Sequence, residues 1–469
     1  MILAALYEYY QRVAGSGENA PPPPGFVVQK VTGAIQLDAD GRFLGILPLL
    51  VPADKGKDRP RPMVVPDVGP RPGKQIKPAF VCDTAAFLLG YDPDDPERAS
   101  AKFAAAAAFH QNLLAKTKTA VAVAVLRYFE SWNVGSVDFS TVEPFLSGFL
   151  VFIVDGSFVH EHPVVQAAWQ RHAAASTSTT LGQCLVTGAD SVPIARLHPA
   201  IKGAGGQPGG TLLVSFNFDA AESYGHVQSF NAPVSETAAF GYAAALNHLL
   251  RRETNRARTI GDMTVVVWAE RPCAGESLLM SLFDPVGLGA DEDSPPEDRA
   301  RAAQVRDALD CIMRGEMPAD LKADEGVKFY LLGVSPNAAR LSVRLWQVST
   351  LGELIDNVRQ HQRDLMLVTD SPKRAPYPAL WTLVNETRPK DGDGRSRGRP
   401  DNDKRYKLHG DLLRAALGGG RYPAALLPEL LCRFAEAAPR WLSRMVRLRS
   451  VPCATVCNRS KAANRRPSR

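Results

Sequence analysis

Residues 329–349 read FYLLGVSPNAARLSVRLWQVS, and they form the clearest β-hairpin pattern in the chain. Two apolar runs are separated by a short Pro-Asn-Ala segment, which predicts two strands joined by a turn. Alternation along the second run defines two faces of a strand. One face carries Arg340, Ser342, Arg344 and Trp346, and the other carries Leu341, Val343, Leu345 and Gln347. A nucleic-acid-binding face and a half-buried sheet with arginines lying along it both remain open.

Further strands and helices are predicted on both sides of this hairpin. Strand patterns occur at 149–156, 179–188, 211–218 and 264–270, and another hairpin at 27–50 turns at Asp40-Gly41. Helical patterns occur at 2–13, 97–130, 161–172 and 235–252, and they dominate from about residue 351. This mixture predicts an α+β fold. We expect mixed or antiparallel sheets with helices in the N-terminal part, followed by a helical C-terminal part.

Composition shifts suggest where the chain divides. With 469 residues it is long enough for two or three domains. The predicted parts are an N-terminal α+β domain (1–285), an acidic linker (286–300), a hairpin with helices (301–370), an incomplete helical region (371–436) and a basic tail (437–469).

Charge is distributed unevenly along the chain. The formal net charge is +6, and the tail 437–469 contains nine Lys and Arg residues but no Asp or Glu. The bulk of the chain is therefore not uniformly basic, so any site for a polyanion must be a local patch.

Several function classes find little support in the residues. The seven cysteines are scattered, which argues against a disulfide framework and fits a cytoplasmic protein. A zinc site at Cys453 and Cys457 lacks a second ligand pair. No run of about 18 apolar residues predicts a membrane span. We expect no cofactor.

No catalytic arrangement stands out. Cys184 and His198 are a nucleophile–base pair only if the fold brings them together. Ser157 lacks the glycine elbow of a serine hydrolase, and His160 and His162 lack the helical spacing of a zinc protease. We therefore expect a protein that is not an enzyme.

Segment 52–78 is rich in proline and basic residues, which predicts a long exposed loop. Lys and Arg on such a loop suit contact with nucleic-acid phosphates or grooves. A solvated loop without a ligand is the equally weighted alternative. The candidate side chains are Lys55, Lys57, Arg59, Arg71, Lys74 and Lys77. Asp83 is expected to cap the short helix that follows.

The glycine-rich segment 201–211, IKGAGGQPGGT, lacks the lysine of a phosphate-binding loop, because Thr211 follows the last glycine directly. The segment does not match a dinucleotide-binding fingerprint either, because position 208 is proline. A hairpin connection is favoured over nucleotide binding. Backbone N–H groups beside Lys202 still suit a nucleic-acid phosphate.

Segment 215–236, SFNFDAAESYGHVQSFNAPVSE, is rich in aromatic and amide side chains and contains no Lys or Arg. Its amides Asn217, Gln228 and Asn231 suit hydrogen bonds to base edges. In the alternative, Phe216, Phe218, Tyr224 and Phe230 pack the loop onto its own domain while the amides bond to the backbone. Both interpretations remain open.

Long ordered blocks of the chain resemble the large subunit of the type I-C CRISPR Cascade complex. They are the start MILAALYEYYQR with PPPPGFVVQKVTGAIQLDADG, the segments 76–90, 182–203 and 215–250, TVVVWAE, and 329–365. The resemblance covers most of 1–435. The tail 437–469 departs from it, and we expect a truncated or out-of-frame end.

The resemblance implies a non-catalytic subunit that recognises the short protospacer-adjacent motif (PAM) in duplex DNA, supports R-loop formation and recruits the helicase-nuclease. Guide pairing would supply the long sequence recognition. The implied partners are crRNA, target double-stranded DNA, the Cascade backbone and small subunits, and the helicase-nuclease. A scaffold that holds the crRNA end without reading the motif is the alternative. Lys202, Arg340 and Arg344 are candidates for phosphate contacts.

Overall fold

The computed structural model of the chain describes residues 2–17, 20–52, 58–67, 69, 71, 75–137, 139, 143–175, 178–207, 209–216, 218–251, 254, 256–260, 263–283, 296–366, 377, 380, 383, 387 and 406–432. Two compact units share the chain. Unit 1 comprises Met1–Val13, Leu197–Ala232 and Gly241–Arg469, and unit 2 comprises Ala14–Arg196 and Pro233–Phe240. This division crosses the predicted boundary at residue 285.

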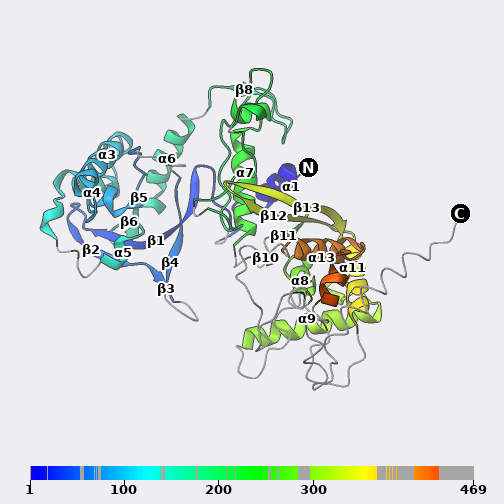
Figure 1. Cartoon of the computed structure of the whole chain (residues 1–469). Coiled ribbons are helices and arrows are strands. Elements are labelled where there is room, and N and C mark those ends of the chain that lie inside the picture. Colours follow the sequence, from blue (N-terminus) through cyan, green and yellow to red (C-terminus); the bar gives the residue numbers. More distant parts are fainter. Residues whose placement is uncertain are drawn as a thin grey trace, which may run out of the picture. The chain divides into compact units, whose positions relative to one another are not determined.

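Unit 2 contains a seven-stranded sheet with helices packed on it (Figure 1). Its strands are β1 (Phe26–Leu37), β2 (Phe43–Pro48), β3 (Leu50–Val51), β4 (Arg59–Pro66), β5 (Cys82–Thr84), β6 (Phe149–Val154) and β7 (Ser157–Phe158), and a separate pair is β8 (Leu181–Gly182) with β9 (Val192–Pro193). Its helices are α2 (Ala85–Leu88), α3 (Pro96–Leu114), α4 (Ala120–Ser131), α5 (Glu143–Leu146) and α6 (Pro163–Ala175).

Strand β1 organises this sheet. It pairs antiparallel with β2 and β4 and parallel with β6, and the order along the sheet is β3-β4-β1-β6-β5. The predicted hairpin at 27–50 is confirmed by the pairing of β1 with β2. Its turn lies at Asp40-Gly41, where the Asp38 carboxylate accepts the N–H groups of Asp40 and Arg42. The sheet mixes parallel and antiparallel pairs, as the α+β prediction requires.

The prediction that 52–78 is entirely loop is wrong for its central part. Residues Arg59–Pro66 form strand β4, which pairs with β1 from Phe26↔Pro66 to Val31↔Arg61. Three prolines occur in this strand, at positions 60, 62 and 66. Short β3 is the only strand that pairs β4 on its other side among the described residues, so β4 lies near the sheet edge, where proline is tolerated.

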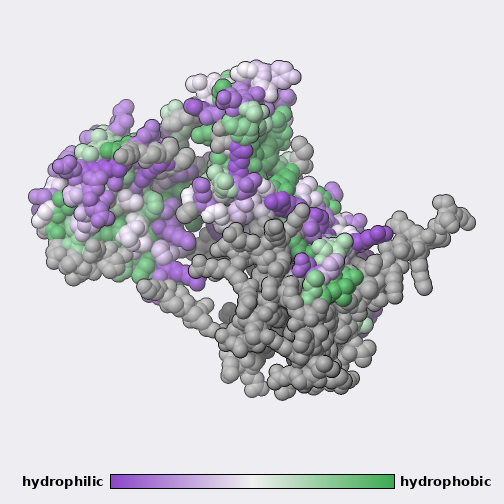
Figure 2. All heavy atoms as spheres, in the orientation of Figure 1, coloured by the Kyte–Doolittle hydropathy of each residue, from purple (hydrophilic) through white to green (hydrophobic). Residues whose placement is uncertain are grey.

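One face of this sheet packs against α2, α3, α4 and α6 in a core that includes Phe80, Tyr128 and Phe152. The helical pattern predicted at 97–130 is confirmed and forms two helices. Asp95 caps α3 by accepting the N–H of Arg98, and Thr119 caps α4 by accepting the N–H of Ala122. Hydrophilic side chains cover much of the surface over α3 and α4 in the view of Figure 2.

Unit 1 is built on a four-stranded antiparallel sheet in the order β10-β11-β12-β13. Its strands are β10 (Ala257–Ile260), β11 (Met263–Ala269), β12 (Lys328–Asn337) and β13 (Arg340–Thr350). Its helices are α1 (Ile2–Val13), α8 (Gly275–Phe283), α9 (Pro296–Arg314), α10 (Ala319–Lys322), α11 (Leu351–Leu365) and α13 (Tyr406–Gly418), and α7 (Glu236–Leu249) begins in unit 2 and continues into unit 1. Residues 426–432 are also helical.

The predicted hairpin at 329–349 is confirmed as β12 and β13, which run from Lys328↔Thr350 to Asn337↔Arg340. The predicted alternation of β13 fails in its middle. Gly333 pairs with Leu345 but the next residue, Val334, pairs with Val343, so Arg344 is an extra residue in a β-bulge. Val343 and Arg344 are both exposed as a result.

One face of this sheet forms the main core of unit 1 with α8, α9, α11 and α13, and Val265, Phe329 and Leu331 are fully buried there. Thr350 begins α11 with a capping box, in which its hydroxyl accepts the N–H of Glu353 and the Glu353 carboxylate accepts the N–H of Thr350. Helix α9 begins at Pro296, so the last residues of the predicted linker are helical.

Two predicted strands are largely absent. Segment 179–188 forms only the two-residue strand β8, and 211–218 forms only isolated bridges at Thr211 and Leu212 among its described residues. The predicted strand 264–270 and helices 2–13 and 235–252 are confirmed as β11, α1 and α7. None of the described helices has both the length and the apolar composition to cross a membrane.

Candidate nucleic-acid interface

Three segments of unit 1 meet at the turn of the β12–β13 hairpin, and they contain most of the described candidate residues. The glycine-rich segment is closed by two mutual hydrogen bonds between Ile201 and Thr211, of 2.7 and 2.9 Å. Leu212 then donates its N–H to Ala339 and accepts the N–H of Leu341, at 3.0 and 2.9 Å. These bonds attach the segment to the hairpin turn.

Lys202 enters this segment from a fixed backbone position. Its N–H donates to Oδ1 of Asn247 on α7 at 2.7 Å, and the amide nitrogen of Asn247 donates to Ala200 at 3.1 Å. Lys202 itself is exposed. The flanking Gly203, Gly205 and Gly206 all have positive φ, which glycine adopts without strain. The segment therefore forms a hairpin-like connection, as predicted, and its cation is displayed from a braced backbone.

Arg340 lies at the start of β13 on the same turn. Its guanidinium carbon lies 4.8 Å from the centroid of the Phe218 ring, which is a cation–π contact. Phe218 is 48% exposed, so the contact lies at the surface. The backbone bridge at Leu212 therefore joins the hairpin turn to the glycine-rich segment. The contact between Arg340 and Phe218 joins the same turn to the beginning of the next loop.

Arg344, at the bulge, is exposed, and its carbonyl accepts a bond from Arg414 of α13 at 3.2 Å. Trp346, which the alternation placed on the same face as Arg344, packs within the sheet. The Trp346 ring stacks on Tyr330 with centroids 5.9 Å apart and lies 5.9 Å from Trp268, which is fully buried. Trp346 therefore packs across the sheet, which favours the half-buried interpretation for this residue.

The loop 222–231 is braced by its own side chains. Oδ1 of Asn231 accepts the N–H of Ser223 at 2.8 Å, and its amide nitrogen donates to His226 at 2.8 Å and to Gln228 at 2.9 Å. The N–H of Gln228 donates to the Glu222 carboxylate at 2.9 Å. Asn231 thus satisfies backbone groups of its own loop, as the packing interpretation predicts. Asn217 lies outside the described residues.

Tyr224 does not pack as that interpretation expects, because it is 100% exposed. Ser223 and His226 form an antiparallel bridge around it, and the N–H of His226 donates to Ser223 at 3.0 Å. Tyr224 and Gly225 both have positive φ, 53° and 73°, the combination of a type I′ turn. The Tyr224-Gly225 pair in the sequence could have indicated a tight turn with an exposed tyrosine.

The candidates in unit 2 have different environments. Lys55, Lys57 and Lys74 lie outside the described residues. Arg59, on β4, and Lys77 are exposed. Both terminal guanidinium nitrogens of Arg71 donate hydrogen bonds to the Asp83 carboxylate, at 2.8 and 2.7 Å. The same guanidinium lies over the Phe87 ring.

Asp83 is fully buried and also accepts the N–H groups of Ala79 and Thr84, at 2.7 and 2.8 Å. It is therefore not the predicted helix cap. Thr84 occupies the cap position of α2. The buried carboxylate uses Arg71 as its counter-ion, so this arginine supports the fold of the segment and is not carried into the proposed interface.

The residues considered for catalysis have structural partners. Cys184, in unit 2, accepts the N–H of Ser235 at 3.2 Å. Burial raises the pKa of its thiol, but hydrogen bonds from Ser235 and Thr187 outweigh burial and lower it to about 7. His198, in unit 1, lies 2.6 Å from the Tyr242 hydroxyl, and burial lowers its pKa to about 4. Within the described ranges, no group of three metal-ligating side chains occurs.

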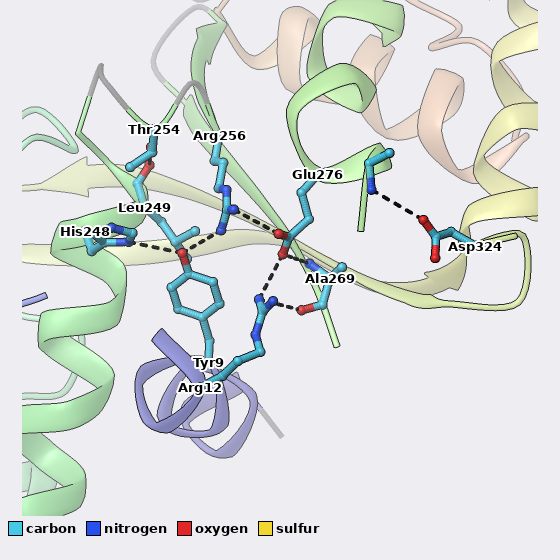
Figure 3. A network of polar contacts seen from close by, with 10 residues as sticks. Tyr9, Arg12, His248, Leu249, Thr254, Arg256, Ala269, Glu276 and Asp324 are labelled. Carbon is cyan, nitrogen blue, oxygen red and sulfur yellow. Dashed lines mark hydrogen bonds and ion pairs between the residues drawn. The ribbon is translucent and has the colours of Figure 1, made fainter. Parts of the chain in front are cut away.

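A network of polar contacts joins α1 to the sheet of unit 1 (Figure 3). Glu276 of α8 accepts bonds from Arg12 at 2.9 Å, from Arg256 at 2.8 Å and from the N–H of Ala269 at 3.0 Å. The Tyr9 hydroxyl accepts a bond from Arg256 at 2.6 Å. The Tyr9 hydroxyl also lies 3.0 Å from Nδ1 of His248. Two guanidinium groups neutralise one buried carboxylate, so the network fastens the first helix to its unit.

Comparison with known proteins identifies a family. The model of the family described as CRISPR-associated protein (Cas_Csd1) matches residues 6–466. The match extends beyond residue 435, where the resemblance was expected to fade. No curated protein matches the chain.

Proposed function

Because the chain belongs to the Csd1 family of CRISPR-associated proteins, the large subunits of type I-C Cascade, we propose that it recognises the PAM in duplex DNA and supports R-loop formation. The family match over residues 6–466 is the observation that carries this proposal. In such complexes guide pairing reads the long target, and protein contacts read only a short duplex element and backbone shape. Recruitment of the helicase-nuclease and a cytoplasmic location belong to the same proposal.

Local basic residues at the hairpin turn support the proposal. Lys202 and Arg340 come from segments that hydrogen bonds join, and Arg344 follows on the same strand. Cations on a braced backbone suit phosphate contacts, because little conformational entropy is lost when they bind. Their neighbour Phe218 offers an aromatic face beside a cation, which suits a base next to a phosphate.

The experiment compares DNA binding by Cascade assembled with this chain. The probes are guide-matched duplexes in which the bases of the adjacent motif are randomised, together with the same library carrying an unmatched target. We expect enrichment of a short motif beside the matched target. Equal recovery of all motifs would overturn motif recognition.

A scaffold role is the second candidate, and exposed apolar side chains of unit 2 favour it. Leu44 and Leu47 of β2 and Val51 of β3 are 64%, 40% and 44% exposed, which suits contact with a neighbouring protein. On this view the complex would bind all motifs equally but lose its subunits when these residues become polar. Leu44→Ser with Leu47→Ser tests this by the composition of the purified complex. Leu185→Ser, at a position 65% exposed elsewhere in unit 2, is the control.

We also propose that the chain is not an enzyme. Cys184 and His198 have the structural partners described above. Nuclease turnover that is retained through purification and abolished by Cys184→Ala or Ser157→Ala would contradict this proposal.

A further inference from the structure

Tyr224 combines full exposure with an unfavourable backbone conformation. Its side chain is 100% exposed, and its φ is 53°. This left-handed region is unfavourable for a non-glycine residue, whereas glycine adopts it freely. An exposed ring recovers none of that cost by burial. Folding therefore gives no reason for tyrosine at this position.

Hydrogen bonds within the surrounding loop hold the backbone that carries Tyr224. The Asn231 side chain accepts one hydrogen bond and donates two, and the N–H of Gln228 donates to Glu222, so both ends of the turn are connected. Gln228 also has positive φ, 51°, so a second non-glycine residue of the loop is strained. Strain that internal bonds maintain on a displayed side chain is typical of a binding site prepared in advance.

The loop is joined at its base to cations. The turn Asp219–Ala221 directly follows Phe218, whose ring lies under the Arg340 guanidinium. The segment 218–231 itself contains two carboxylates, Asp219 and Glu222, and no Lys or Arg. A nucleic-acid backbone is therefore attracted to Arg340 and Lys202 and repelled from the loop, which leaves an uncharged base as the group that suits the Tyr224 ring.

We propose that Tyr224 is a base-stacking residue, whose ring packs on an unpaired nucleobase of the target DNA while Arg340 and Lys202 hold phosphates of the same strand. This inference rests on the proposed function and deepens it. Every base has a flat face, so the contact positions the strand without reading its sequence. Reading the motif then falls to other residues.

The test uses Cascade assembled with this chain and a guide-matched duplex. Pairing with the guide fixes which nucleotide of the target lies at each position of the complex. Three variants are compared with the wild type: Tyr224→Gly, Tyr224→Ala and Tyr224→Phe. Glycine removes the ring and the backbone strain together, so poor folding cannot explain a loss. We expect Gly and Ala to weaken binding about 5- to 150-fold, the range for one base stacked on an aromatic ring, and Phe to stay within about twofold of the wild type.

A second set of probes locates the base. Each nucleotide near the motif is replaced in turn by an abasic site, which keeps the phosphate and removes the ring. At one position, we expect the abasic probe to bind wild type and Tyr224→Gly equally, because removing either partner of a stack removes the whole contact. Additive losses at every position would overturn the proposal.

Three other outcomes are decisive. If Tyr224→Gly binds every probe as the wild type does but loses a protein subunit on purification, the ring contacts protein and base stacking is wrong. If the wild type itself shows no preference among motifs, the proposed function fails. If it shows that preference and all Tyr224 variants share its affinity, only the stacking inference fails.

Discussion

The segments 71–84 of unit 2 and 218–231 of unit 1 both bind a predicted nucleic-acid-contacting side chain to internal partners, and they differ in what they expose. In the first, the predicted DNA-contacting Arg71 is bound to a fully buried carboxylate. In the second, an amide predicted to read bases braces the backbone, and the loop displays an aromatic ring. A residue's chemical type therefore did not indicate its task, because the partner that the fold supplies decides whether a group remains available.

The largest expected effect breaks the buried pair of the first segment. Asp83→Ala leaves the Arg71 charge and two backbone N–H groups without their acceptor, so we expect a loss of about 3–5 kcal/mol in the free energy of unfolding. Denaturant unfolding of the full chain measures it. Arg127→Ala removes an ion pair whose partners are both more than half exposed, and should cost less than about 1 kcal/mol. Equal losses of unfolding free energy in the two variants would contradict the expected difference between a buried and an exposed ion pair.

Lowering the pH tests the stability of the same buried segment of unit 2. Val81 donates its N–H to Nε2 of His110 at 2.9 Å, beside Asp83, and burial lowers the pKa of His110 to about 4. The unfolded chain binds a proton near pH 6.5, so the stability that neutral His110 provides is present above pH 6.5 and is lost as pH falls toward 4. The loss is on the order of 3 kcal/mol.

The readout is the slope of unfolding free energy against pH between 6.5 and 4. His110→Gln keeps an acceptor and cannot take up the proton, so its slope should be smaller than that of the wild type, whatever its absolute stability. An unchanged slope would show that His110 does not contribute. His160, whose pKa burial also lowers to about 4, contributes in the same direction and remains in both proteins.

A smaller effect is expected in the second segment. Asn231→Ala removes three hydrogen bonds from the loop and should destabilise it by about 1–3 kcal/mol, chiefly as local opening. Hydrogen exchange at 222–231 should become faster, while exchange at 76–84 stays as in the wild type. Unchanged protection of the loop would mean that Asn231 is available to a ligand after all.

The smallest expected effect concerns salt. Each phosphate contact contributes about one to the slope of log affinity against log salt concentration. Lys202→Gln, Arg340→Gln and Arg344→Gln should each lower that slope by about one for DNA binding by the complex. Arg71→Gln should leave the slope unchanged, because its guanidinium is bound to Asp83. A drop with Arg71→Gln instead would place the DNA near unit 2.

Much of the architecture could be predicted from local patterns. The hairpin at 329–349 was predictable because its two runs alternate and a turn separates them. The bulge at Arg344 was not, since it depends on how β13 pairs with β12. Segment 211–218 has a strand's composition but bridges to Ile201 and Arg340 only singly, which no local pattern reveals.

The sequence alone determined the family, the α+β composition and the lack of a recognisable catalytic motif, because ordered blocks and periodicity are local properties. The tertiary structure decided which candidate groups remain available. Arg71 and Asp83 are twelve residues apart, and Arg340 meets Phe218 across more than a hundred. Such pairings arise only when separate segments pack together, and they determine which charges are buried.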